Sequence, residues 1–167
     1  MPGPRPIEFE RVISALNDSG VDYVIVGGIA AVLHGVDRLT ADLDVVLDLQ
    51  RDAALKALKS LEKIGYRPRP PVRMEEFAEA ERRKQWMETR NMQVFSLWDP
   101  RGELPVLDLF VSYPLDFARL LDDSVEVDIG GLRARIASVD HLIEMKSGTN
   151  RDKDRQDIAA LREKDGR

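Results

Sequence analysis

Hydrophobic residues follow two different spacings along the chain, and each spacing predicts one kind of element. Short runs of apolar and β-branched residues predict strands, which we expect at 22–26, 43–47, 92–98, 104–111, 125–129 and 132–136. Apolar residues three or four positions apart predict helices, which we expect at 7–17, 28–33, 51–64, 74–89, 114–121, 139–146 and 151–163. Elements interleaved in this way predict an α+β (α/β) fold, a small mixed β-sheet flanked by helices on one side.

Turn residues join these elements without marking a boundary between domains. The tetrapeptide 99–102 and the pair Gly130-Gly131 each separate two apolar runs, which predicts two antiparallel hairpins. Segment 67–71 contains three prolines and is expected to have no regular structure. Because no repeat or long linker interrupts the chain, we expect residues 1–167 to form a single domain with a sizeable core.

Composition excludes several classes of protein. The chain has no cysteine, so it can form neither a disulfide nor a thiolate zinc site. Its longest apolar run, 23–33, is too short to span a membrane, and residues 1–6 lack the apolar core of a signal peptide. We therefore expect a cytoplasmic protein with no membrane partner. The net charge of −5 argues against general coating of nucleic acid but allows a local basic groove.

Two aspartates stand at the start of the strand expected at 43–47. Asp42 and Asp44 are two positions apart, so their side chains project from one face of the strand while its apolar residues project from the other. Two like charges about 7 Å apart repel each other, and aspartate is unfavourable in strands. A divalent cation with oxygen ligands would compensate for this arrangement. The alternative is a solvated outer face that carries two harmless acids.

A third acid and a glycine pair favour the cation. Asp108 lies on the polar face of the strand expected at 104–111, which could pair beside the first strand. Three carboxylates on adjacent strands can hold two Mg²⁺ (or Mn²⁺) ions that clamp a triphosphate. Gly27 and Gly28, between a buried strand and a helix, leave backbone N–H groups open to a phosphate. Ordinary tight turns use glycine pairs as well, so the pair indicates a phosphate-binding loop only in combination with the acids.

These residues together resemble the nucleotidyltransferase superfamily related to DNA polymerase β. The resemblance rests on the glycine pair, on a later strand with an acid, and on the motif Arg38-x-Thr40-x-Asp42-Leu43-Asp44. This form is most similar to small bacterial members, which include the abortive-infection toxins of the type IV toxin–antitoxin class. One departure is Gly28, because many members carry serine at that position.

The resemblance implies a role for each candidate residue. The catalytic residues, which are also the metal ligands, would be Asp42, Asp44 and Asp108. The nucleotide-binding residues would be Gly27, Gly28, Arg38, Thr40, Lys146 and Arg151. The last two belong to a C-terminal pattern of small relatives, a helix with lysine followed by Arg-x-Lys-Asp and then by an aspartate three residues on, here Asp157. In this pattern Asp154 would orient Lys146 or Arg151. A solvated helix with alternating charges is the alternative for this segment.

The sequence thus predicts a metal-dependent nucleotidyltransferase that moves an NMP from an NTP to an acceptor. The acceptor could be RNA, a protein or a small molecule, and one version of the prediction is a toxin–antitoxin component with a cognate antitoxin as its partner. The alternative is a catalytically inactive module of the same fold that binds a nucleotide or a partner.

Two further groups of residues are candidates for other roles. Only two histidines are present, and His34 follows a helical apolar face, so we expect His34 to be structural. The basic residues between 67 and 90, among them Arg82, Arg83 and Lys84, could form an acceptor-binding rim for RNA. Interspersed glutamates favour an ordinary solvated helix instead.

Overall fold

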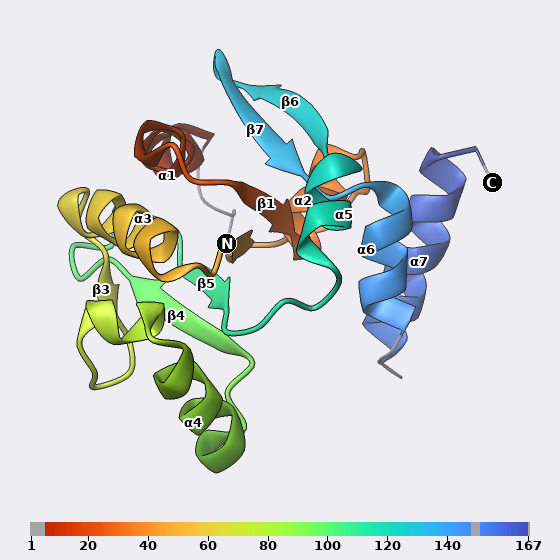
Figure 1. The fold of residues 1–167 in the computed structure, drawn as a ribbon. Coiled ribbons are helices and arrows are strands. Elements are labelled where there is room, and N and C mark those ends of the chain that lie inside the picture. Colours follow the sequence, from red (N-terminus) through yellow and green to blue (C-terminus); the bar gives the residue numbers. More distant parts are fainter. Residues whose placement is uncertain (1–5, 148–150, 167) are drawn as a thin grey trace.

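The computed structural model describes residues 6–147 and 151–166, and their strands form one mixed sheet (Figure 1). The strands are β1 (Tyr23–Val26), β2 (Leu43–Leu47), β3 (Arg67–Pro68), β4 (Val94–Trp98), β5 (Leu107–Phe110), β6 (Val125–Ile129) and β7 (Leu132–Ile136). Their order across the sheet is β3-β4-β5-β2-β1-β7-β6. The pairs β2–β5 and β1–β7 are parallel and the other pairs are antiparallel. The predicted mixed sheet is confirmed, with β5, β2 and β1 at its centre.

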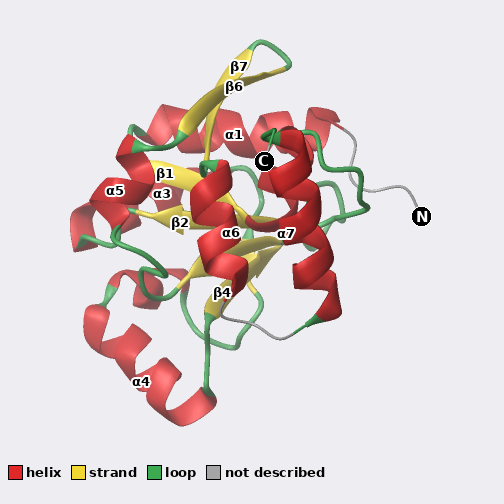
Figure 2. Ribbon diagram, turned by 90° about the vertical axis from the view of Figure 1, so that its right-hand side faces the viewer, coloured by secondary structure: helices red, strands yellow, loops and turns green. Residues whose placement is uncertain are grey.

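Helices cover both sides of this sheet. They are α1 (Pro6–Ser19), α2 (Gly27–Leu33), α3 (Arg51–Lys63), the 3₁₀ helix η1 (Met74–Ala78), α4 (Ala80–Arg90), α5 (Phe117–Asp122), α6 (Val139–Ser147) and α7 (Asp152–Lys164). Figures 1 and 2 show α1 and α3 on one side of the sheet and the α6–α7 pair on the other. The expectation that helices lie on one side only was therefore wrong.

The hydrophobic pattern explains which face of β2 is buried. Leu43, Val45 and Leu47 are fully buried on one face, while the other face carries the half-buried Asp44 and the fully buried Val46. Helix α3 presents a matching buried stripe, made of Ala54, Ala57, Leu58 and Leu61. Burial of one such large side chain stabilises the fold by about 1.5–3 kcal/mol, so this face fixes the register of the central strands.

Two expectations about the segment 67–89 were wrong. Arg67–Pro68 forms the short edge strand β3 paired with β4, because a proline is tolerated where its missing N–H would face solvent. The single helix expected at 74–89 is interrupted at Glu79, whose backbone is extended. The interruption allows Phe77 from η1 and Trp86 from α4 to stack against the same ring of Phe95, at 5.2 and 5.3 Å between centroids.

The structure also bears on the expectations about membranes. Each helix within residues 6–147 and 151–166 is too short or too polar to cross a bilayer. The segment 1–5, on which most of the signal-peptide expectation rests, lies outside the described residues.

Candidate active site

Two of the three candidate acids lie side by side at the centre of the sheet. Asp44 on β2 is paired with Asp108 on β5, so their side chains project from the same face. The next residue in this row is Ser96 on β4, whose hydroxyl donates a hydrogen bond to Asp108 Oδ1 at 2.5 Å. Asp42 lies just before β2 and is exposed, whereas Asp44 and Asp108 are half-buried. The predicted pairing of the two acid-bearing strands is thus confirmed.

The crowding of these acids changes their protonation. Burial, followed by the negative charges of Asp108 and Asp42, raises the pKa of Asp44 to about 7, although Lys146 and Arg38 act in the opposite direction. Burial also raises the pKa of Asp108, while the hydrogen bond from Ser96 lowers it. It is therefore unfavourable for these carboxylates to be ionised at the same time, and a nearby cation would relieve their repulsion.

The donor chemistry of the three acids fits a divalent cation. Carboxylate oxygens are the ligands that Mg²⁺ and Mn²⁺ prefer, and the repulsion at Asp44 is the kind that a cation relieves. However, no three acidic or histidine side chains within the described ranges are gathered closely enough to form a ready cation site. The strands thus place the carboxylates of Asp44 and Asp108 side by side, but the described residues do not form a complete set of metal ligands.

A cavity of about 430 Å³ lies against this row of acids. Its lining residues are Gly27, Gly28, Arg38, Leu39, Thr40, Ala41, Asp42, Asp44, Lys146, Arg151, Lys153 and Asp154. Eight of the nine site residues expected from the sequence are among them, and the ninth, Asp108, is the neighbour of Asp44 across β2–β5. The fold therefore brings residues from the two ends of the chain to one cavity.

The two glycines of the β1–α2 junction are glycines for different reasons. Gly27 has a left-handed backbone (φ +71°), and a Cβ there would collide with Asp44 Oδ2. Gly28 has an ordinary backbone, but a Cβ there would lie only 2.7 Å from Thr40 Oγ1. The junction is thus pressed against both the acid strand and the segment that precedes it. The serine that many members of the resembled superfamily carry at position 28 has no room here.

Two buried aspartates of α7 bind three of the four basic side chains that line the cavity. Asp157 accepts hydrogen bonds from Lys146 Nζ, at 2.8 Å, and from Arg38 Nη1. Asp154 accepts one from Arg151 Nε at 2.8 Å and lies 3.7 Å from Lys146 Nζ. Contact of Asp154 with both cations agrees with the orienting role expected for it.

The C-terminal pattern of small relatives includes Asp157, but sequence reasoning gave this residue no role at the site. A signal for it existed, because Asp157 follows Asp154 by three positions and precedes the buried Leu161 by four. That spacing places all three residues on the inner face of α7.

The structure corrects one of the other candidates and supports another. Arg83 is buried, and its guanidinium donates to the carbonyl oxygens of Val111 and Phe77 at 3.1 and 2.7 Å. Arg83 therefore cannot belong to the basic rim suggested for RNA, because its N–H groups satisfy carbonyls in the interior. His34 Nε2 lies 2.8 Å from the carbonyl oxygen of Ala137, which agrees with the structural role expected for this histidine.

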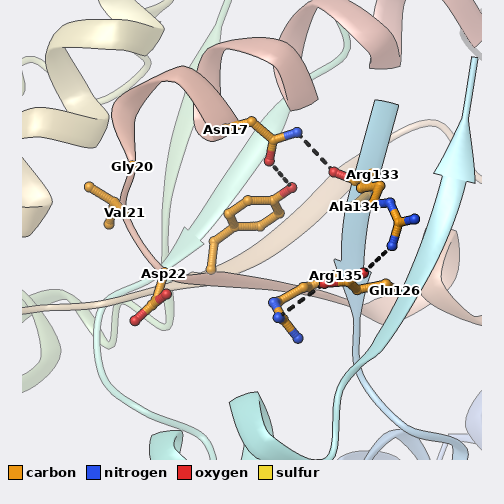
Figure 3. A pocket seen from close by; sticks show the side chains of 9 residues that line it. Asn17, Gly20, Val21, Asp22, Glu126, Arg133, Ala134 and Arg135 are labelled. Carbon is orange, nitrogen blue, oxygen red and sulfur yellow. Dashed lines mark hydrogen bonds and ion pairs between the residues drawn. The ribbon is translucent and has the colours of Figure 1, made fainter. Parts of the chain in front are cut away.

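A second cavity, of about 250 Å³, lies between the end of α1, the start of β1 and the β6–β7 hairpin (Figure 3). The hydroxyl of Tyr23 donates to Asn17 Oδ1, and Asn17 Nδ2 donates to the carbonyl oxygen of Arg133, both at 2.8 Å. Glu126 pairs with Arg133 and Arg135 at 2.7 and 3.2 Å. The polar side chains of this cavity largely satisfy one another, and the sequence predicted no site residue here.

Comparison with known families and structures gives independent information. Residues 8–162 match the family described as "Nucleotidyltransferase of unknown function (DUF6036)". No curated protein sequence matches the chain significantly.

Several solved structures are similar to this one. The lincosamide antibiotic adenylyltransferase LnuA, in a lincomycin-bound crystal structure, is 19% identical over 96% of this chain and 98% of its own, with a TM-score of 0.63. ANT(2")-Ia in complex with adenylyl-2"-tobramycin is 13% identical over 94% and 87%, with a TM-score of 0.60. An antigenic nucleotidyltransferase-like protein from Paracoccidioides brasiliensis is 19% identical over 96% and 78%, with a TM-score of 0.59. At these identities the likeness establishes the fold.

Proposed function

The chain belongs to the DUF6036 family of nucleotidyltransferases, and on that premise we propose that it transfers an NMP from an NTP to an acceptor hydroxyl with the help of a divalent metal. The observation that carries this proposal is the cavity in which the Gly27–Gly28 junction, four basic side chains and the row of acids meet. In this proposal residues 1–167 act as one domain, in the cytoplasm where NTPs are available.

The triphosphate would lie over Gly27 and Gly28, which have no side chains of their own to block its approach to the backbone. Arg38, Lys146 and Arg151 would neutralise its charge, and their position along the cavity wall supports this role. A cation held near the departing pyrophosphate stabilises the charge that develops on it during transfer.

Asp42, Asp44 and Asp108 would hold the metal, Mg²⁺ or Mn²⁺. Such an ion, when bound, supplies positive charge to the phosphate oxygens. The oxygen of the acceptor forms a bond to the α-phosphorus while the α–β anhydride bond breaks and pyrophosphate leaves. Asp108 would accept the proton of the acceptor hydroxyl, and its hydrogen bond with Ser96 supports this role because it fixes the direction of the carboxylate.

A small hydroxylated molecule is the acceptor class that the similar structures favour. LnuA is described as an antibiotic adenylyltransferase, ANT(2")-Ia was captured with adenylylated tobramycin, and this chain covers 98% and 87% of theirs. A fold of this size is therefore sufficient for transfer to a small molecule. RNA or a protein side chain as acceptor, and a toxin paired with an antitoxin, remain the other versions of the proposal.

The second candidate function is a nucleotide- or partner-binding module without turnover. The observation that favours it is the absence, within the described residues, of a ready three-ligand cation site.

Label transfer separates the two candidates. The protein is incubated with each α-³²P-labelled NTP, Mg²⁺ and a panel of acceptors that includes a cell extract, with and without EDTA. We expect label on an acceptor and release of pyrophosphate, both abolished by EDTA. Tight NTP binding without label transfer for any of the four bases would instead establish the binding module.

A further inference from the structure

The segment ahead of β2 presses one side chain against the glycine pair. A Cβ built on Gly28 would lie 2.7 Å from Thr40 Oγ1, 3.1 Å from Thr40 Cβ and 3.4 Å from Arg38 Cζ. Real Cβ atoms almost never approach another atom to less than 3.0 Å. Because the φ angle of Gly28 is not positive, its backbone alone does not require glycine. The Thr40 side chain occupies the space that a side chain at position 28 would need.

The Thr40 hydroxyl is available to a ligand. It has no hydrogen-bond partner among the residues that the structure describes, and Thr40 lines the 430 Å³ cavity. Threonine hydroxyls commonly bond to nearby backbone. Thr89 shows this behaviour, since its Oγ1 donates to the carbonyl oxygen of Gln85 at 2.7 Å. Thr40 therefore differs from an ordinary surface threonine in both its position and its free hydroxyl.

We propose that Thr40 Oγ1 donates a hydrogen bond to a phosphate oxygen of the bound nucleotide, and that residue 28 is glycine so that Thr40 can take this position. The inference rests on the proposed function. The guanidinium of Arg38, the hydroxyl of Thr40 and the backbone of Gly28 lie together at this point. These groups offer hydrogen-bond donors, and phosphate oxygens are acceptors only, so phosphate is the chemical group that suits the set.

The binding role is tested by separating the hydroxyl from the shape of Thr40. Thr40→Val keeps the size of the side chain and removes the hydroxyl, whereas Thr40→Ser keeps the hydroxyl. Thr89→Val makes the same chemical change far from the cavity and serves as the matched control. The affinity of each variant for inorganic triphosphate with Mg²⁺, and for each of the four NTPs with Mg²⁺, is measured by calorimetric titration.

We expect Thr40→Val to weaken binding about tenfold or more, because a hydrogen bond to a charged group is lost. Thr40→Ser should stay within about threefold of the wild type. The control should not change binding. The melting temperature of Thr40→Val should stay close to that of the wild type, since the lost hydroxyl has no partner among the described residues.

The steric part of the inference has its own test. Gly28→Ala should lower the melting temperature, and much of that loss should disappear when Thr40→Ala removes the clashing oxygen. An equal loss with and without Thr40 Oγ1 would overturn this part.

The outcomes distinguish a failure of the Thr40 proposal from a failure of the proposed function on which it rests. If the wild type binds no triphosphate and no NTP, the proposed function fails and the inference falls with it. If the wild type binds but Thr40→Val binds equally well, or Thr40→Ser is as weak as Thr40→Val, only the inference is overturned.

Discussion

The cavity at the start of β1 and the cavity beside β2 are both lined by charged residues, and they differ in how the charges are satisfied. In the cavity at the start of β1, hydrogen bonding from Arg133 and the charge of Arg135 lower the pKa of Glu126 (Figure 3). In the cavity beside β2, burial and two neighbouring carboxylates raise the pKa of Asp44 to about 7. Charged residues by themselves therefore do not identify a functional site. An arrangement that is costly without a ligand identifies it better.

The glycines show the same difference. Gly20, which lines the first cavity, and Gly27, which lines the second, have nearly the same left-handed backbone, with φ +70° and +71°. A Cβ on Gly20 would meet no atom within 4 Å, so that glycine serves only a turn. A Cβ on Gly27 would collide with Asp44 Oδ2. Of these two glycines, only Gly27 lies against a group of the candidate site.

The largest expected effect contrasts Asp108 with Glu126. Asp108→Ala should lower label transfer by about 10²–10⁴-fold, because it removes the proposed proton acceptor. NTP binding should persist in part, since Asp42 and Asp44 remain. Glu126→Gln, in the other cavity, should transfer label at the wild-type rate. Equal losses from the two substitutions would remove the distinction between the cavities.

Ligand-induced stabilisation should depend on only one cavity. Mg²⁺ with an NTP should raise the melting temperature more than either alone, and at 100 times Kd the gain is about 2.7 kcal/mol. The double variant Asp42→Asn/Asp44→Asn should lose this gain, whereas Arg133→Gln should keep it. Thermal unfolding with and without ligands measures both. Unfolding of the double variant without ligand would indicate that the two acids are structural.

The burial of Asp44 and the repulsion from its neighbours predict a dependence of stability on pH. Its pKa is about 7 in the folded protein and close to 3.8 without the fold. Between these values the folded state binds more protons, so stability should fall as pH rises through this window. Asp44→Asn should therefore be more stable than the wild type by about 1–3 kcal/mol at pH 8, and nearly equal to it at pH 4.

Urea unfolding in EDTA at the two pH values checks this prediction. A variant that is less stable than the wild type at pH 8 would contradict it. Asp48→Asn makes the same change at a half-buried aspartate just beyond β2 and is the matched control.

The smallest effect is expected at the first cavity. Glu126→Gln removes ion pairs between side chains that are each 42% exposed or more. Such pairs are screened by water, so the urea midpoint should stay within experimental error. A clear loss of NTP binding in this variant would show that the two cavities form one functional unit.

The sequence by itself determined the local elements and the candidate chemistry. The strands Leu43–Leu47, Val125–Ile129 and Leu132–Ile136 agree with the expected ranges because their apolar residues and glycine turns are local signals. The candidate residues could be chosen from the sequence because metal and phosphate chemistry restricts the residue types. Their assignment as site residues stays a prediction, while their gathering at one cavity and its neighbouring strand is a property of the structure.

Only the tertiary structure decided how distant segments meet. Arg38 and Asp157 are 119 positions apart and form an ion pair, and no periodicity predicts such a contact. The sequence suggested that Arg83 is a surface cation. In the structure it is buried, because its guanidinium donates hydrogen bonds to carbonyl oxygens of η1 and of the segment after β5. Thr40 meets Gly28 because a loop folds back onto the β1–α2 junction. Hydrophobic spacing fixes which face of an element is buried, whereas the partner on that face depends on packing between elements that are not adjacent in the chain.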